Sequence, residues 1–338
     1  MELKKILVRA PNWLGDAVVS LPALRAVRAR FPKAHLAALA RSGVADLYRR
    51  ETCCDQVIVC RKGRRWRVAR ELRAQGFDCA ILLPNSFDAA LVAWLARIPR
   101  RIGYARDRRG WLLTDAVAPP LGGETPPHER FYYMELLWRA GMLEELPAME
   151  TIELSHVEQA REAGAALFRQ MGLEGPVIGL SPGAQNSRAK QWMPEGFTEA
   201  AVRLAGELEA AVALFGSEAE RELAQGIAEA VRRAGYPVLN LAGETSLERF
   251  IELAAACRVF LTNDSGAMHV AAATGVPTVA IFGPTIVEAT GPVSARARVV
   301  REPVECSPCM LRDCPIDHRC MRRITAERVA QAARELLE

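Results

Sequence analysis

Short apolar runs alternate with amphipathic helical segments along almost the whole chain, and this alternation constrains the possible folds more than any other feature. In the first half, an apolar run at residues 5–9 precedes helical spacing over 16–30, and a run at 79–83 precedes helical spacing over 87–96. Strands that alternate with helices in this way form parallel sheets. We therefore predict an α/β protein built from doubly wound sheets.

The pattern restarts in the second half of the chain, which indicates a second domain. Strands predicted at 177–180, 211–215, 238–241, 259–262 and 278–282 alternate with helices predicted at 156–171, 197–208, 219–234, 247–257 and 267–274. A chain of 338 residues is also too long for one ordinary hydrophobic core. We place one domain at residues 1–155 and the other at 156–324. Residues 325–338 have helical spacing and could pack on either domain.

The two halves differ in charge. Residues 1–150 contain 25 basic and 16 acidic side chains, whereas the remainder contains 19 and 24. The first half should therefore face an anionic partner. Apolar residues make up 50% of the chain, a balance that excludes disordered, collagen-like and coiled-coil proteins.

The N-terminal residues lack the apolar core of a signal peptide, and Gly275, Pro277, Gly283 and Pro284 interrupt the long charge-free stretch at 265–287. We therefore expect a cytoplasmic protein without a transmembrane segment. Nine cysteines, five of them scattered, do not suggest a secreted disulfide framework.

Ligands of open parallel sheets bind beyond the carboxyl ends of the strands, so the loops that follow strands are the most informative. The first such loop, residues 10–16, ends with Asp16 in the first turn of a helix. An aspartate there can be a helix cap or a partner of the helix dipole. It can also be a general base that takes a proton from an acceptor hydroxyl.

The second loop, residues 181–192, follows a buried strand. Its start matches the G-x-S-x-G pattern of hydrolases, but Pro182 has no amide to bind an oxyanion, so the hydrolase interpretation fails. Arg188 and Lys190 then either neutralise a departing diphosphate or are solvated loop cations.

The third loop, residues 262–269, leads into a helix of small residues. The free amides of such a helix start bind phosphate, and Asp264 can accept hydrogen bonds from sugar hydroxyls, although it could equally be an N-cap. In the fourth loop, Ser217 and Glu220 have capping-box spacing, and Glu218 or Glu220 could instead hold a ribose diol.

Several familiar nucleotide signatures are absent from the sequence. It contains neither G-x-G-x-x-G nor G-x-x-x-x-G-K-[ST], and no two aspartates are two positions apart, so no D-x-D pair can hold a metal on a diphosphate. Activation by cations and amides, without metal or cofactor, is then the simpler scheme.

Arginine-rich runs occur at 61–67 and 100–109. They could form a solvated helix face, bind single-stranded nucleic acid or bind an anionic lipid-linked sugar. The cysteines at 306, 309, 314 and 320, with His318 nearby, could bind a structural metal, take part in redox chemistry or remain reduced.

Taken together, four segments resemble glycosyltransferase family 9. They are Asn-Trp-Leu-Gly-Asp at 12–16 with the following Ala-Val-Val-Ser-Leu-Pro, the loop from Pro182 to Trp192, Asn-Asp-Ser-Gly-x-Met-His at 263–269, and Cys-Ser-Pro-Cys at 306–309. The matches occur in order across nearly the whole chain. The Asn-Trp-Leu-Gly-Asp form is typical of the type II heptosyltransferases of this family.

This resemblance implies a GT-B architecture, in which two Rossmann-like domains face each other across a cleft and a final helix packs back on the N-terminal domain. It also implies inverting, metal-independent transfer of L-glycero-D-manno-heptose from ADP-heptose to the first heptose of the lipopolysaccharide inner core. The acceptor, heptosyl-Kdo2-lipid A, is anionic and lipid-linked. The enzyme would be a monomer peripheral to the cytoplasmic face of the inner membrane.

The resemblance also assigns roles to individual residues. Asp16 matches the general base, and Lys190 the group that stabilises the departing diphosphate. The remaining donor-binding positions are Gln185, Asn186, Glu218, Glu220, Thr245, Ser246, Leu247, Asp264, Ser265, Gly266 and His269. The acceptor-binding positions are Asn12, Arg64, Arg65 and Arg67.

The sequence departs from the family pattern at two points. Gln191 stands where many relatives carry a second cation, and the linker with Asp317 and His318 is shorter than usual. A transferase of the same family with another sugar nucleotide or acceptor remains an alternative. A zinc-stabilised nucleic-acid-binding protein is the non-enzyme alternative.

Overall fold

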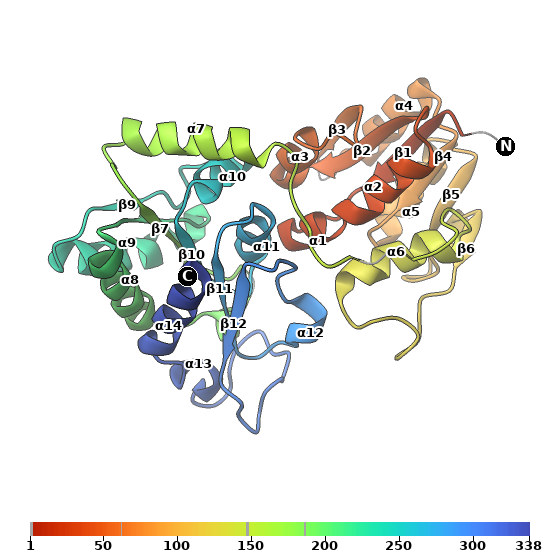
Figure 1. Ribbon diagram of the computed structural model, residues 1–338. Coiled ribbons are helices and arrows are strands. Elements are labelled where there is room, and N and C mark those ends of the chain that lie inside the picture. Colours follow the sequence, from red (N-terminus) through yellow and green to blue (C-terminus); the bar gives the residue numbers. More distant parts are fainter. Residues whose placement is uncertain (1–2, 62, 147–148, 186) are drawn as a thin grey trace. The chain divides into compact units, whose positions relative to one another are not determined.

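The computed structural model describes residues 3–61, 63–146, 149–185 and 187–338. The chain divides into two compact units, Met1–Met149 (unit 1) and Glu150–Glu338 (unit 2). This boundary lies slightly before the junction predicted from the sequence. In Figure 1, unit 1 runs from red to yellow and unit 2 from green to blue.

Unit 1 contains one six-stranded sheet in the order β3-β2-β1-β4-β5-β6, and all neighbouring strands are parallel. The strands are β1 (Lys5–Arg9), β2 (His35–Arg41), β3 (Gln56–Cys60), β4 (Cys79–Leu82), β5 (Arg100–Tyr104) and β6 (Asp115–Val117). The chain first builds outward from β1 to β3 and then returns to place β4 on the other side of β1. The strand order therefore reverses between β1 and β4, where open α/β sheets bind ligands.

Helices cover both faces of this sheet. They are α1 (Leu14–Val19), α2 (Leu21–Arg30), α3 (Ser42–Arg49), α4 (Arg65–Gln75), α5 (Phe87–Leu95) and α6 (Glu129–Arg139). The buried sides of α4 and α5 share one core with the sheet. Helices α1, α2, α3 and α6 pack against one another, and α3 also contacts β2 and β3. The helix predicted over 16–30 is two helices, because Ser20 ends α1 and Pro22 occupies the first turn of α2, where a proline is tolerated.

Unit 2 repeats this plan with a parallel sheet in the order β12-β11-β10-β7-β8-β9. Its strands are β7 (Val177–Ser181), β8 (Ala211–Leu214), β9 (Val238–Asn240), β10 (Val259–Asn263), β11 (Thr278–Phe282) and β12 (Ala297–Arg301). The order reverses between β7 and β10. Both strands are buried along their whole length, as expected for the centre of a parallel sheet.

The helices of unit 2 are α7 (Val157–Gln170), α8 (Pro194–Leu208), α9 (Arg221–Arg233), α10 (Leu247–Ala255), α11 (Gly266–Ala273), α12 (Val287–Thr290), α13 (Arg319–Arg322) and α14 (Ala326–Leu337). One face of the sheet shares a core with α8, α9 and α14. On the other face, α10 lies between α7 and α11.

The structure contradicts the packing that the family resemblance implied for the C-terminal helix. Its apolar stripe, which includes Val329, Ala330 and Ala333, is fully buried in the core of unit 2. Helix α14 contacts α8, β11 and β12 of that unit. Because this stripe is buried there, residues 325–338 belong to unit 2.

Helices α7 and α10 approach each other closely at Gly164. A Cβ at this position would lie 2.0 Å from the backbone oxygen of Glu252 on α10. We predict that Gly164→Ala lowers the free energy of unfolding by roughly 1–3 kcal/mol, because the backbones must move apart. The control is Gly226→Ala on α9, where a Cβ would meet nothing within 4 Å. That variant should gain about 0.5–1 kcal/mol from helix propensity, and urea unfolding would check both. Equal effects of the two substitutions would contradict the close approach.

Candidate active site

In unit 1, the loop between β1 and α1 is built on the buried guanidinium of Arg9. This group donates hydrogen bonds to the backbone oxygens of Ala10 and Leu39 and to Oδ1 of Asn12, the last at 2.6 Å. Burial lowers the pKa of Arg9. Asn12, predicted to bind the acceptor, is therefore held in the structure by Arg9, which sequence reasoning did not select.

Asp16 lies half-buried in the first turn of α1, directly after the switch point. Tyr48, on α3, helps to fix the C-terminal end of this short helix by a hydrogen bond with Ser20. Ser20 Oγ donates to the backbone oxygen of Ala17 at 2.8 Å, and the hydroxyls of Ser20 and Tyr48 are 3.2 Å apart. Because burial raises the pKa of Tyr48, its hydroxyl stays protonated near neutral pH and this contact with Ser20 is kept. A rigid support of this kind is what a catalytic carboxylate requires.

Helix α6 places further ionisable groups near Asp16. Desolvation and, next, the negative charge of Asp16 raise the pKa of the Glu129 carboxyl, whereas Arg106 lowers it. Burial raises the pKa of Tyr133 well above its ordinary value, and Asp16 adds to that shift. Two neighbouring carboxyls with different surroundings are a recurrent feature of acid-base sites. Sequence reasoning missed Glu129, because a glutamate at the start of a helix carries no distinctive signal.

The loops after β4 and β5 are joined by Arg109, whose side chain is fully buried. Its guanidinium donates to the backbone oxygens of Tyr104, Pro84 and Ser86, and burial lowers its pKa to about 10. The Nη2 atom has no hydrogen-bond partner among the residues that the structure describes. Arg109 therefore belongs to the scaffold of the site and not to a solvated arginine run.

The arginines predicted to bind the acceptor lie at the start of α4. Arg64, Arg65 and Arg67 are all exposed, and Arg65 Nε lies 3.4 Å from Oδ1 of Asp88 on α5. Exposed cations at the carboxyl edge of the sheet can contact an anionic acceptor without a large desolvation penalty.

In unit 2, three loops at the carboxyl ends of neighbouring strands meet in one constellation. Lys190 Nζ, from the loop after β7, lies 2.8 Å from Oδ2 of Asp264, which follows β10. Thr285, which follows β11, donates a hydrogen bond of 2.7 Å from Oγ1 to the same oxygen. Asp264 is only 4% exposed, whereas the Lys190 side chain keeps access to solvent. The structure thus brings together the predicted Lys190 and Asp264, and adds Thr285.

Asn263 fixes the loop that carries Lys190. Its buried side chain accepts a hydrogen bond from the backbone N–H of Trp192 at 3.0 Å and donates to the backbone oxygen of Pro182 at 2.7 Å. The two ends of the loop are thereby tied to β10 by one amide group. Asn263 was part of the recognised motif but was not predicted as a site residue.

The cysteine segment supports the same loop from the other side. Ala189, next to Lys190, donates its N–H to the backbone oxygen of Arg312 at 2.9 Å, and its own oxygen lies 2.7 Å from Nε2 of His318. Arg188 forms an ion pair with Asp313 at 2.7 Å. The segment therefore positions the turn that carries Lys190.

No group of three or more His, Cys, Asp or Glu side chains is arranged to hold a metal ion within the part of the chain that the structure describes. The cysteines of the segment are free thiols, and burial followed by the neighbouring Cys306, Cys314 and Cys309 raises the pKa of Cys320.

The other predicted donor-binding residues lie in the loops at this edge. Ser265 is the N-cap residue of α11, Gly266 begins the helix, and His269 is buried within it. Ser246 caps α10 by accepting the N–H of Arg249 at 3.2 Å, with Thr245 before it and Leu247 after it. Gln185 is exposed, and Asn186 lies outside the described residues.

Glu218 and Glu220 have different environments. Glu220 Oε2 accepts hydrogen bonds from the N–H and the hydroxyl of Ser217 at 2.7 and 2.8 Å, which completes the capping box. Glu218 is exposed, and its carboxylate lies against Gly243. Since Glu220 already serves as a cap, Glu218 is the better candidate for binding a ribose diol.

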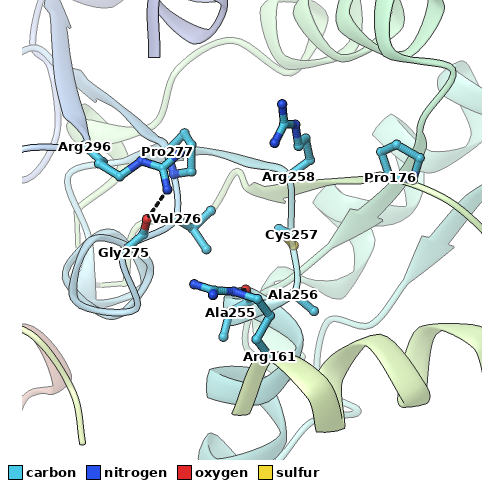
Figure 2. Close-up of a pocket in the computed structure, with 10 residues that line it drawn as sticks. All are labelled: Arg161, Pro176, Ala255, Ala256, Cys257, Arg258, Gly275, Val276, Pro277 and Arg296. Carbon is cyan, nitrogen blue, oxygen red and sulfur yellow. Dashed lines mark hydrogen bonds between the residues drawn. The ribbon is translucent and has the colours of Figure 1, made fainter. Parts of the chain in front are cut away.

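A hollow of about 420 Å³ lies at the opposite edge of the same sheet (Figure 2). Apart from Arg161, which lies within α7, its lining residues precede the strands or lie at or just after the ends of helices, and they include Arg258 and Arg296. Arg161 donates to the backbone oxygen of Ala255 at the end of α10, and Arg296 to that of Gly275 beyond α11. Arginines that cap helix C-termini have a structural role, so we do not assign this hollow to the site.

The constellation of unit 2 can bind a diphosphate. It combines an ammonium group with the free amides at the start of α11, and its buried carboxylate can accept hydroxyl groups. The constellation of unit 1, as we use the term, is the supported carboxylate of Asp16 in α1 together with the exposed arginines at the start of α4. The first suits a sugar nucleotide, and the second suits activation of an acceptor hydroxyl.

Comparisons with known proteins agree with this chemistry. A sequence model of the family described as glycosyltransferase family 9 (heptosyltransferase) matches residues 65–319. The chain is 35% identical to lipopolysaccharide heptosyltransferase 2 of Salmonella typhimurium over 308 residues, which cover 88% of each protein.

Solved structures are similar over almost the whole chain. The structure of Escherichia coli ADP-heptose lipopolysaccharide heptosyltransferase II shares 33% identity, covers 98% of both chains and gives a TM-score of 0.84. A glycosyltransferase family 9 structure from Veillonella parvula shares 25% identity, covers 100% of this chain and 98% of that one, and gives a TM-score of 0.83. The two parallel sheets and these similarities confirm the predicted α/β fold of the GT-B class.

The role of Asn263 in holding both ends of the Lys190 loop can be tested by measuring the free energy of unfolding. Asn263→Ala leaves the N–H of Trp192 and the oxygen of Pro182 buried without their partner. Each unpaired group costs about 1–3 kcal/mol, so the free energy of unfolding should fall by roughly 2–5 kcal/mol. In the control variant, Asn240→Ala at the half-buried end of β9, water can replace the lost bonds, and the loss should stay below about 1 kcal/mol. Similar losses in both variants, measured by urea unfolding, would refute this role.

The environment of Glu129 predicts a pH-dependent stability. A carboxyl whose pKa is raised by folding stabilises the folded state while protonated, and this contribution is lost as the pH rises through the raised pKa. Glu129→Gln mimics the protonated form, so it should melt at a higher temperature than the wild type above that pKa. The difference should vanish below the ordinary glutamate pKa of about 4.3. Thermal unfolding across this range checks the sign, and a difference that does not change with pH would contradict the electrostatic origin.

Proposed function

Because the chain belongs to glycosyltransferase family 9, the heptosyltransferase family, we propose that it transfers a heptose from ADP-heptose to the lipopolysaccharide core. The proposed donor sugar is L-glycero-D-manno-heptose, and the proposed acceptor is the first heptose of heptosyl-Kdo2-lipid A. The contact of Lys190 with Asp264 at the switch point of unit 2 carries the proposal, since it presents an ammonium group where the diphosphate of a sugar nucleotide is expected to bind.

The proposed reaction is a single displacement at the anomeric carbon. Asp16 takes the proton of the acceptor hydroxyl, the acceptor oxygen forms a bond to C1 of the heptose, and the bond from C1 to the diphosphate oxygen breaks. Lys190 and the amides at the start of α11 neutralise the charge that develops on the leaving ADP. Because attack occurs on the face opposite ADP, the configuration at C1 inverts. The scheme uses no metal ion.

The remaining residues bind the two substrates. Asp264, Ser265, Gly266 and His269 would hold the donor sugar and its phosphates, with Glu218 at the ribose and residues 245–247 at the adenine. Exposed Arg64, Arg65 and Arg67 would contact the anionic acceptor.

An acceptor of this kind is anchored in a membrane. None of the helices in the described residues is long and apolar enough to span one. We propose that the enzyme works as a monomer, peripheral to the cytoplasmic face of the inner membrane.

Two substitutions test the proposed roles. Asp16→Asn removes the base but keeps the shape of the side chain, so kcat should fall about 10²–10⁴-fold while the Kd for ADP-heptose, measured by calorimetry, stays nearly unchanged. Lys190→Ala should both weaken donor binding and lower kcat by about 10²–10³-fold.

The matched controls are Asp46→Asn and Lys33→Ala in unit 1, whose side chains lie outside the two constellations. Both should keep wild-type kinetics. Turnover of Asp16→Asn at the wild-type rate would exclude Asp16 as the base. Unchanged donor affinity in Lys190→Ala would exclude Lys190 as a diphosphate ligand.

A further inference from the structure

Helix α5 is apolar on both its sides, which is unusual for a helix on the surface of a domain. Its sheet side consists of the buried Ala89, Ala90, Val92 and Ala93. Its other side carries Phe87 and Trp94, which are 39% and 45% exposed, and half-buried Leu91, between them in sequence, reaches the core. Asp88 is the one charged residue of the helix, and it pairs with Arg65. A helix that is apolar all round is normally covered on both sides.

Trp111 extends this face. It lies in the short helix η1 (Gly110–Leu112), which contacts α5, and it is 67% exposed. Its ring centroid lies 6.2 Å from that of Phe87 and 6.4 Å from that of Trp94. Phe87, Trp94 and Trp111 therefore form one continuous patch, which we call the α5–η1 aromatic surface.

The positive charge of unit 1 is concentrated in the segment that carries this surface. Residues 61–111 contain 13 basic and 4 acidic side chains, whereas the other residues up to 150 contain 12 of each. Exposed Arg97 follows Trp94 by three positions, and exposed Arg108 precedes Trp111 by three. Neither arginine forms an ion pair within the described ranges. The apolar patch is thus accompanied by unpaired cations.

We propose that the α5–η1 aromatic surface docks unit 1 on an anionic lipid bilayer. Indole and phenyl rings prefer the interface between headgroups and acyl chains, and arginines at the same level bind lipid phosphates. The inference deepens the proposed function, on which it rests for the membrane-anchored acceptor. It names the surface that would hold the enzyme at that membrane.

The geometry favours a bilayer over single-stranded nucleic acid. Stacking of bases requires ring faces that are open and separate. Here the rings of Phe87 and Trp94 both pack against Trp111. Such a surface can enter an apolar phase, but it offers few open platforms for bases.

The test is co-sedimentation of the full chain with vesicles of phosphatidylcholine, with and without phosphatidylglycerol. The wild type should bind the vesicles that contain phosphatidylglycerol. The double variant Trp94→Ala/Trp111→Ala should bind them at least about tenfold more weakly, because two large apolar contacts are lost. The matched control is Trp138→Ala on α6, a tryptophan that is 44% exposed outside this surface, which should bind like the wild type.

A second pair of substitutions tests the charge. Arg97→Asn and Arg108→Asn remove both cations while tolerating the left-handed backbone at these positions, where φ is 57° and 56°. This double variant should also bind at least about tenfold more weakly, by the usual contribution of a basic residue near an anionic surface. The tryptophan fluorescence of the wild type should shift to the blue on binding, and this shift should disappear in Trp94→Ala/Trp111→Ala.

Four results would overturn the proposal. The first is failure of the wild type to bind vesicles, and the second is vesicle binding by Trp94→Ala/Trp111→Ala at wild-type strength. The third is an equal loss in Trp138→Ala, and the fourth is binding of poly(U) that the double tryptophan variant abolishes while vesicle binding persists. The vesicle experiment needs no substrate. Failure of the wild type to bind ADP-heptose would therefore count against the proposed function alone, whereas failure to bind vesicles would count against the docking surface alone.

Discussion

The ion pair of Lys190 with Asp264 is the interaction around which the candidate site of unit 2 is organised. Asp264 is almost completely buried, and a buried carboxylate is stable only when its charge is neutralised and its oxygens are hydrogen-bonded. Lys190 supplies the charge and Thr285 a hydrogen bond. These partners can reach one oxygen only because β7, β10 and β11 end at the same edge of a parallel sheet. The topology of the sheet is therefore a condition for the chemistry of the site.

Buried polar side chains hold the loops of both units in place. Arg9 and Arg109 tie together the loops at the switch point of unit 1, and Asn263 does the same for the Lys190 loop of unit 2. Each bonds mainly to backbone oxygens, so its loss would leave unpaired groups inside the protein. Because Arg9, Arg109 and Asn263 fix the backbone of these loops, only a few other side chains are needed to contact the proposed substrates.

The sequence was sufficient to predict the α/β fold class, strands β1 and β4 of unit 1 and strands β7 to β11 of unit 2, because these depend on local periodicity and on the order of elements. Strands β2, β3, β5, β6 and β12 were not predicted individually. The sequence could not predict contacts that depend on tertiary packing. Thr285 was missed because nothing in its local sequence marks it, and Glu129 because it is near Asp16 only through the packing of α6. The burial of Arg109 inside an arginine-rich run was equally hidden, since charge patterns do not show which guanidinium faces the core. The apolar stripe of α14 predicted a helix but not the sheet that covers it.

The same ion pair has a consequence for how the proposed donor is selected. If a diphosphate binds Lys190 as proposed, it would draw the ammonium group toward the phosphate oxygens and away from Asp264, which would keep its hydrogen bond from Thr285. A buried carboxylate that loses a partner is costly unless another donor replaces it. The hydroxyl groups of a sugar attached to the diphosphate can act as that donor, whereas ADP alone has none at that position. The site would thus favour an intact sugar nucleotide over the free nucleotide, and it would release ADP once the sugar has been transferred.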